Sequence, residues 1–251
     1  MNITLQINGE RRKILILPGD TLLKTLRAQG FYGAKHGCES GECGACTVLL
    51  DGKPVNSCVL LAAQADGHTI ETIEAVGEHP DQGWVATKGL HAVQEAFVES
   101  GAIQCGYCTP AMVLAAKELL GRNPEANEAE VRETFSGILC RCTGYLKPVQ
   151  AVMRAAANLR GETIEPIGCS IPAPSAWLEP GGEPFLFPGA ESHPPEAGAS
   201  GEREVIAPFR IMPRVQLTPE AERWLRVGKP ERKVDAVKLV QGKPAFTADF
   251  D

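Results

Sequence analysis

With 251 residues, 43% of them hydrophobic and 22% charged, the chain has a globular composition that excludes wholesale disorder. Its 25 lysines and arginines against 31 aspartates and glutamates give a net charge of −6, which argues against nucleic acid as the main partner. No apolar run approaches the roughly 18 residues that span a bilayer, and no secretory signal is visible, so we expect a cytoplasmic protein without membrane insertion.

Residues 1–78 are predicted to form a small mixed sheet with one helix packed on it. Asn8-Gly9 and Asp51-Gly52 are hairpin turn signals. Thr21 is predicted to cap a short helix over residues 22–26. The segments with strand patterns are 3–7, 13–17, 47–50 and 69–73.

Residues 82–160 change to helical spacing. Leu90, Val93 and Phe97 lie on one helical face, which we interpret as core packing. Further helix starts are predicted from a cap at Thr109 followed by Pro110, from a capping box at 127–130, and after Pro148, with a stop at Gly121. Four helices with short connections are expected to form a bundle.

Residues 161–215 are predicted to be an extended linker. They carry Pro-rich and Gly-rich stretches, and 13 of the 19 prolines follow residue 160. A short helix is expected over 218–227, where Thr218-Pro219 is another cap-and-proline start, and the remainder to residue 251 has no clear period.

Eight of the nine cysteines lie between Cys38 and Cys142 and form two sets of four. An odd number of cysteines in a reducing compartment makes a disulfide framework a poor interpretation. The first set has the spacing Cys-x4-Cys-x2-Cys-x11-Cys and consists of Cys38, Cys43, Cys46 and Cys58.

This first set matches the plant-type [2Fe–2S] pattern, with three thiols from one glycine-rich loop and a fourth from further along. Glycines suit such a loop because it must adopt positive φ and turn backbone N–H groups toward sulfur. A zinc site is the alternative, but zinc favours two arms of paired cysteines, often with histidine. We interpret His36, beside the loop, as a surface or packing residue.

The second set has the spacing Cys-x2-Cys-x31-Cys-x-Cys and consists of Cys105, Cys108, Cys140 and Cys142. Both halves lead into predicted helix starts, where N–H groups and the helix dipole favour an anionic cluster. A four-thiolate zinc site remains an alternative interpretation of this set, although a single residue between two cysteines is unusual for zinc.

Two clusters in one small chain favour the passage of single electrons over bond-making on a substrate. No nucleophile–base arrangement or phosphate-binding loop is evident, so no catalytic residue is predicted. Cys169 lies in the predicted linker and is interpreted as belonging to neither cluster.

Three motifs carry a resemblance to a known family. They are Gly37 to Cys46, Gln104-Cys105-Gly106-Tyr107-Cys108-Thr109-Pro110, and Leu139-Cys140-Arg141-Cys142-Thr143-Gly144-Tyr145. Together they resemble the iron–sulfur subunit of molybdenum hydroxylases, the xanthine dehydrogenase and aldehyde oxidoreductase family, over residues 1–160. The resemblance implies an α+β fold, with a β-grasp ferredoxin domain over 1–78 and a four-helix-bundle [2Fe–2S]-binding domain over 82–160.

The same resemblance implies cofactors and partners. The first four cysteines would hold an outer [2Fe–2S] cluster, and the second four an inner one. The inner cluster would lie nearest a molybdopterin cofactor in a molybdenum-binding large subunit, with Gln104 and Cys142 contacting the pterin. Electrons would pass on to FAD in a further subunit or to an external acceptor.

Residues 216–251 resemble the opening of that molybdenum-binding subunit. The resemblance rests on Val227-Gly228-Lys229-Pro230, on Val234-Asp235-Ala236, and on Gly242-Lys243-Pro244-Ala245-Phe246-Thr247-Ala248-Asp249. An unrelated C-terminal extension is the alternative.

We therefore expect the electron-transfer subunit of an enzyme that oxidises an aldehyde or a purine-type N-heterocycle on a partner subunit. A free-standing two-cluster ferredoxin and a zinc-stabilised interaction module are the alternatives. The substrate is not readable from this chain, because the resemblance puts the substrate pocket on the partner.

Overall fold

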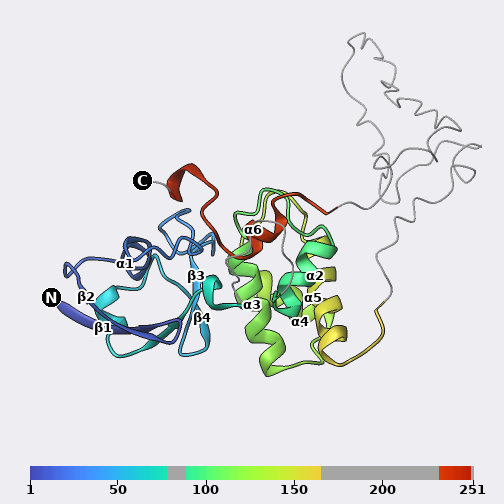
Figure 1. Ribbon diagram of the computed structural model, residues 1–251, viewed down its shortest axis with the longest axis horizontal. Helices are drawn as coiled ribbons and strands as arrows, with labels where there is room; N and C mark the ends of the chain where they lie inside the picture. The colour runs from blue at the N-terminus through green and yellow to red at the C-terminus, as the bar shows by residue number, and fades with distance from the viewer. Residues whose placement is uncertain (78–88, 165–231, 250–251) are drawn as a thin grey trace, which may run out of the picture. The chain divides into compact units, whose positions relative to one another are not determined.

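The computed structural model describes residues 1–77, 89–164 and 232–249 (Figure 1). Nearly all of the predicted linker, the short helix predicted over 218–227 and Cys169 lie outside the described residues. None of the helices in the part that is described is long and apolar enough to cross a membrane.

A five-stranded mixed sheet forms within residues 1–77 (blue in Figure 1). Its strands are β1 (Asn2–Ile7), β2 (Glu10–Leu15), β3 (Thr47–Leu50), β4 (Lys53–Asn56) and β5 (Thr69–Glu71). The spatial order is β2-β1-β5-β3-β4, with β1 and β5 parallel and all other neighbours antiparallel. Both predicted hairpin turns, Asn8-Gly9 and Asp51-Gly52, have positive φ at their two central residues, as two-residue hairpins require.

Helix α1 (Leu22–Ala28) packs on this sheet and shares its core. Thr21 caps the helix as predicted, because its hydroxyl accepts a hydrogen bond from the Lys24 N–H at 3.2 Å. The buried residues common to sheet and helix are Ile3, Leu5, Ile7, Leu22, Leu23, Leu26, Val48 and Ile70. The alternation predicted for the first strand is confirmed.

Four helices follow and share a second core. They are α2 (Ala92–Glu99), α3 (Thr109–Arg122), α4 (Glu128–Phe135) and α5 (Leu146–Leu159). Val93 and Phe97 are fully buried in this core, as expected for one helical face. Leu90 packs against the core but lies before His91, the N-cap of α2, so it is not part of that face. Helix α3 also contacts β3 and β4.

The ends of α3 differ from the prediction. Cys108 is the N-cap and Thr109 is already helical, so Pro110 stands at the second helical position. Proline is accepted anywhere in the first turn, where backbone N–H groups have no partner within the helix. The helix also continues past Gly121 to Arg122, because one glycine weakens a helix by only about 1 kcal/mol and packing overrides it.

Helices α4 and α5 show one prediction confirmed and one corrected. The capping box of α4 is present: the Asn127 side chain accepts from the Glu130 N–H, and the Glu130 carboxylate accepts from the Asn127 N–H. Helix α5 begins at Leu146, two residues before Pro148 and not after it. Again the proline lies in the first turn, which tolerates it.

Residues 232–249 form a segment that packs back onto this fold (red in Figure 1). Helix α6 (Ala236–Val240) contacts α2 and α3, and a single 3-10 turn follows at Thr247–Asp249. The buried side-chain amide of Gln94 donates to the Val240 carbonyl oxygen at 3.1 Å. The segment is therefore an integral part of the second core.

Candidate metal centres

The first four predicted ligands surround the start and end of the β3–β4 hairpin. Cys38 and Cys43 lie on the loop after α1, Cys46 immediately precedes β3, and Cys58 follows β4. The loop is closely packed. A Cβ atom at Gly37 would lie 2.7 Å from the Cys43 sulfur, so only glycine fits there.

The thiols of this loop sit in contrasting environments. Hydrogen bonds from Ser40 and from the Cys43 N–H lower the pKa of the exposed Cys38 thiol to about 6. Burial raises the pKa of the Cys46 thiol to about 11. The Cys43 N–H lies 3.3 Å from the Cys38 sulfur and is the kind of donor that stabilises a sulfur carrying negative charge.

The second four predicted ligands lie beside helix starts, as the sequence indicated. Cys108 is the N-cap of α3. Cys142 lies three residues before Tyr145, which is the N-cap of α5. The Tyr107 N–H points to the Cys105 sulfur at 3.5 Å, and the Thr143 hydroxyl lies 3.1 Å from the Cys140 sulfur. Burial raises the pKa of the Cys108 thiol.

Within each set the thiols lie near one another. The Cys46 thiol interacts with that of Cys58, and the Cys105 thiol interacts with those of Cys142 and Cys140. Among the described histidine, cysteine, aspartate and glutamate side chains, no three converge closely enough to hold a single metal ion.

Two tyrosines beside these cysteines were missed by sequence reasoning. The Tyr145 hydroxyl accepts from the Cys140 N–H at 2.9 Å and donates to the Ile138 carbonyl oxygen at 3.1 Å. Tyr145 itself adopts a positive φ of 65°, which is uncommon for a residue with a side chain. The Tyr107 hydroxyl donates to the His36 carbonyl oxygen at 2.6 Å. Both tyrosines stand in the motifs that carry the family resemblance, but nothing in the sequence indicates the bonds that their hydroxyls make.

The two cysteine loops touch each other directly. The Leu139 N–H donates to the Cys43 carbonyl oxygen at 2.9 Å, so a residue adjoining Cys140 is bonded to a predicted ligand of the other set. At the same contact, a Cβ atom on Gly44 would lie 2.1 Å from the Gly137 carbonyl oxygen. The hydrogen bond from Tyr107 to His36 is a second link.

Part of the second set is exposed. Gln104, Cys105 and Cys142 are all exposed, and so are the apolar side chains of Leu139 and Leu146, which flank the second cysteine pair in sequence and are 59% and 57% exposed. His36, beside the first set, is also exposed and lies 2.7 Å from the Glu39 carboxylate, as expected for a surface residue.

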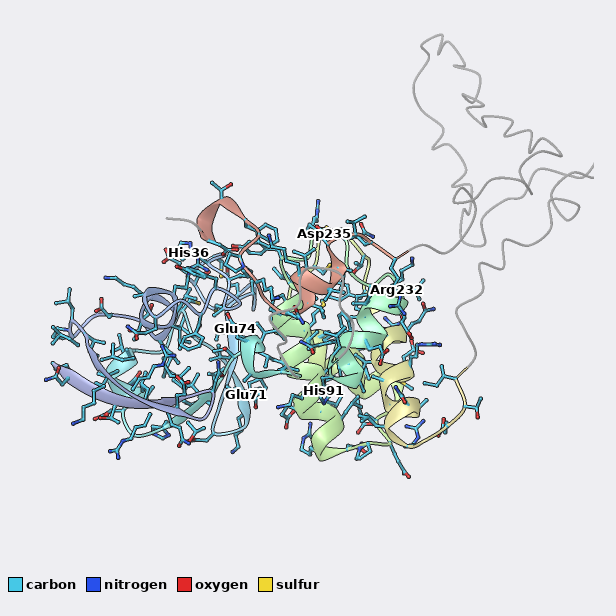
Figure 2. All side chains as sticks on the ribbon, viewed as in Figure 1. His36, Glu71, Glu74, His91, Arg232 and Asp235 are labelled. Atoms are coloured by element: carbon cyan, nitrogen blue, oxygen red, sulfur yellow. The ribbon has the colours of Figure 1, made fainter. Side chains whose placement is uncertain are left out.

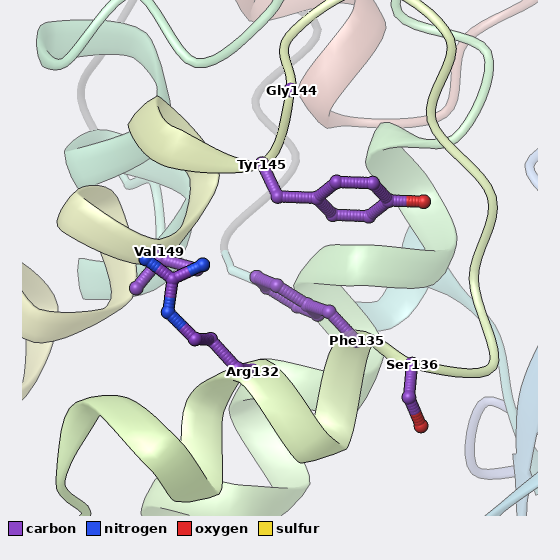
Figure 3. Close-up of a pocket in the computed structure, with 6 residues that line it drawn as sticks. All are labelled: Arg132, Phe135, Ser136, Gly144, Tyr145 and Val149. Carbon is purple, nitrogen blue, oxygen red and sulfur yellow. The ribbon is translucent and has the colours of Figure 1, made fainter. Parts of the chain in front are cut away.

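A cavity of about 320 Å³ lies next to Tyr145 (Figure 3). Its lining residues are Arg132, Phe135, Ser136, Gly144, Tyr145 and Val149. The Arg132 guanidinium is bonded to the Glu128 carboxylate at 2.6 Å, and the lining contains no cysteine. The cavity therefore lies beside the candidate metal centre and is not part of it.

Comparison with known proteins identifies both halves of the fold. Residues 5–72 match the family model of the 2Fe-2S iron-sulfur cluster binding domain, and residues 72–153 match that of the [2Fe-2S] binding domain. The nicotinate dehydrogenase small FeS subunit of Eubacterium barkeri is 46% identical over 159 residues, which are 63% of this chain and 96% of that subunit. The chain belongs to the iron–sulfur subunit family of the molybdenum hydroxylases.

Solved structures of this family share the fold. Quinoline 2-oxidoreductase from Pseudomonas putida 86 matches with a TM-score of 0.57 and 43% identity, covering 65% of this chain and 98% of that chain. Aldehyde oxidoreductase from Desulfovibrio desulfuricans ATCC 27774 matches with a TM-score of 0.59 and 42% identity over 64% of this chain. The match spans only 17% of the aldehyde oxidoreductase chain.

Proposed function

We propose that this chain is the electron-transfer subunit of a molybdopterin-dependent hydroxylase whose large partner subunit oxidises the substrate. Its [2Fe–2S] clusters, when bound, carry single electrons, while the protein supplies binding, orientation and electrostatics. The observation that carries the proposal is that residues 5–72 and 72–153 match two [2Fe-2S] domain models and that their cysteine loops meet in the 2.9 Å hydrogen bond from the Leu139 N–H to the Cys43 carbonyl oxygen. This bond joins the two cysteine loops by one short backbone contact.

We assign the ligands of the two clusters by set. The outer cluster takes Cys38, Cys43, Cys46 and Cys58, and the inner cluster takes Cys105, Cys108, Cys140 and Cys142. The N–H donors near Cys38 and Cys105 support this assignment, because they can stabilise sulfur that carries negative charge. Zinc favours two arms of paired cysteines, often with histidine, whereas three cysteines of the first set stand close together in one glycine-rich loop.

The inner set faces the molybdenum-binding subunit in this proposal. The exposure of Gln104 and Cys142 leaves both side chains accessible to a pterin in the partner. Leu139 and Leu146 are exposed apolar side chains that a partner would cover. The exposed Cys38 leaves the outer set accessible to a flavin subunit or an external acceptor.

We extend the proposal to the finer architecture. The five-stranded sheet with α1 corresponds to a β-grasp ferredoxin domain over residues 1–78, and α2–α5 correspond to a four-helix bundle over 82–160. Residues 161–215 remain proposed as a linker, and 216–251 as a segment like the opening of the molybdenum-binding subunit. The cytoplasm stays the predicted location.

The substrate class follows from the relatives. Their names refer to nicotinate, to quinoline and to an aldehyde, so their substrates are N-heterocycles and aldehydes. We propose an aldehyde or an N-heterocycle for the assembly that contains this chain. The chain's own residues hold and insulate the electron carriers and do not contact the substrate.

Metal analysis of the native assembly tests the proposal. We expect about four irons and about one molybdenum per copy of this chain, together with a large partner subunit. About four irons in a monomer without molybdenum would establish a free-standing ferredoxin instead. A colourless protein with zinc in place of iron would contradict both.

A further inference from the structure

A buried ion pair links the loop after α1 to the C-terminal segment of the described residues. The Lys35 ammonium donates to the Asp249 carboxylate at 2.8 Å, and each side chain is only 1% exposed. Asp249 also accepts from the N–H groups of Ala245 and Phe246, both at 3.1 Å, and from the Arg27 guanidinium at 3.3 Å. The aspartate is therefore fully engaged, and it lies 214 residues from the lysine in sequence.

Lys35 belongs to the first cysteine loop. It precedes Cys38 by three residues, and its backbone N–H donates to the Ala45 carbonyl oxygen at 3.1 Å, next to Cys46. A buried ammonium is strongly unfavourable unless an anion compensates it. Asp249 supplies that anion, with the Glu74 carboxylate as a further negative charge in range. Holding Lys35 in place therefore holds the loop.

The same C-terminal segment also contacts the second cysteine loop. The Phe246 ring meets the Tyr107 ring edge-on with centroids 5.0 Å apart, and the Lys35 ammonium lies 5.0 Å from the Phe246 centroid. Leu239 covers Gly106, where an added Cβ would lie 2.6 Å from a Leu239 methyl carbon. Gly106 and Tyr107 are the two residues between Cys105 and Cys108.

We propose that residues 232–249 form a strap that fixes the two cysteine loops relative to each other, and that Asp249 is its positioning residue. The strap lies outside both family models, which end at residues 72 and 153. The inference that the strap anchors the two cysteine loops rests on these contacts alone. The effect that we expect on the clusters rests on the proposed function.

Variants at both ends of the pair separate charge from packing. Asp249→Asn keeps the size of the side chain and leaves Lys35 buried without its carboxylate. Asp235→Asn is the matched control, because Asp235 lies on the same segment (Figure 2) but pairs with Lys233 at the exposed surface. The double variant Lys35→Met/Asp249→Asn removes the uncompensated charge, and Asp249→Glu preserves the charge.

Hydrogen exchange on the full chain in its native assembly measures how firmly the strap and the first cysteine loop are held. The measurement needs no substrate. In Asp249→Asn we expect exchange at the Lys35 amide and across residues 236–246 to accelerate by at least about tenfold. Asp235→Asn should match the wild type, and the double variant should recover part of the protection. Equal exchange rates in Asp249→Asn and Asp235→Asn would contradict the proposal that Asp249 anchors the strap.

The midpoint potential of the outer cluster is a readout that loosened packing alone would not shift in a defined direction. An uncompensated Lys35 ammonium stabilises the more negative reduced form, so the potential should rise in Asp249→Asn and return in the double variant. The midpoint potential of the inner cluster should stay constant.

If Asp249→Asn loses iron, the double variant must restore the iron content. Failure to restore it would contradict the argument that the uncompensated charge of Lys35 is the cause. A strap confirmed in an assembly without molybdenum would leave this inference standing while the proposed function fails.

Discussion

Leu139 donates its backbone N–H to the carbonyl oxygen of Cys43 across 2.9 Å, and this bond joins the two predicted cluster loops. Leu139 adjoins Cys140, so only one peptide unit separates a proposed inner ligand from the bond. Electrons moving between the clusters therefore have a route made of short covalent and hydrogen-bonded steps. Between the side chains of Cys140 and Cys43, the route runs through backbone.

Removing one ligand from each set tests whether electrons pass from molybdenum through the inner cluster to the outer one. Cys142→Ser should reduce iron from about four to about two per chain and abolish substrate-driven reduction of the outer cluster. Cys43→Ser should leave reduction of molybdenum intact but stop transfer onward. Both variants are measured by iron analysis and by electron paramagnetic resonance after substrate addition.

Cys169→Ser is the control for this experiment, because Cys169 belongs to neither proposed set. It should keep full iron content and full turnover. Full turnover with the natural acceptor in Cys142→Ser and in Cys43→Ser alike would refute the proposed path.

The approach of Gly44 to Gly137 predicts a second result. Gly44→Ala would place a Cβ 2.1 Å from the Gly137 carbonyl oxygen, so the two loops must separate. We expect a loss of about 3 kcal/mol in unfolding free energy, since overpacking adds to the strain of positive φ. Denaturant titration of the iron-loaded chain measures the change.

Gly9→Ala provides the matched comparison, because Gly9 also has positive φ but nothing within 4 Å of its Cβ position. Its loss should be only about 1 kcal/mol, the cost of the backbone conformation alone. Similar losses in the two variants would show that the contact between the loops is not tight.

Local patterns predicted local structure well. The alternation of Ile3, Leu5 and Ile7 and the turn at Asn8-Gly9 were sufficient for the first hairpin, because period and turn chemistry act over a few residues. Helix boundaries were less accurate. The N-cap of α3 is Cys108 and not the predicted Thr109. Sequence patterns do not fix which of two neighbouring residues begins a helix, because tertiary packing determines the exact boundary.

The contacts between the loops could not be predicted in the same way. Nothing in the sequence around Lys35 points to Asp249, since hydrophobic periodicity carries no information about a polar partner 214 residues away. The hydroxyl of Tyr145 presents the same difficulty, because a tyrosine beside a cysteine is equally compatible with plain packing. Cysteine spacing was informative because cluster ligation constrains it directly.

Tyr145→Phe tests whether this hydroxyl supports the inner loop. The variant leaves the Cys140 N–H and the Ile138 carbonyl oxygen without their partner, which should reduce the unfolding free energy by about 1–2 kcal/mol. We expect faster loss of iron from the inner cluster on exposure to a chelator. Tyr107→Phe removes only the bond to His36, so any change should appear at the outer cluster. Identical iron-loss kinetics in both variants would contradict the assignment.

Glu74 gives a pH-dependent prediction. Burial raises the pKa of its carboxyl above the ordinary value of 4.5. Its Oε2 atom is buried and has no hydrogen-bond partner among the described residues, while Oε1 accepts from the Gly33 N–H at 2.7 Å. Because the folded state binds this proton more tightly than the unfolded state, the ionised carboxylate destabilises the fold at neutral pH. That penalty disappears as the pH falls through the folded pKa toward 4.5.

Glu74→Gln keeps an acceptor for Gly33 and removes the buried charge. At pH 7 the variant should be more stable than the wild type by about 1 kcal/mol, and the difference should shrink as the pH approaches the ordinary pKa of glutamate. Thermal unfolding at several pH values measures both effects. The attraction between Glu74 and Lys35 acts in the opposite direction. A variant less stable at pH 7 would therefore show that Glu74 serves mainly as a second counter-charge for Lys35, and that burial is the weaker effect.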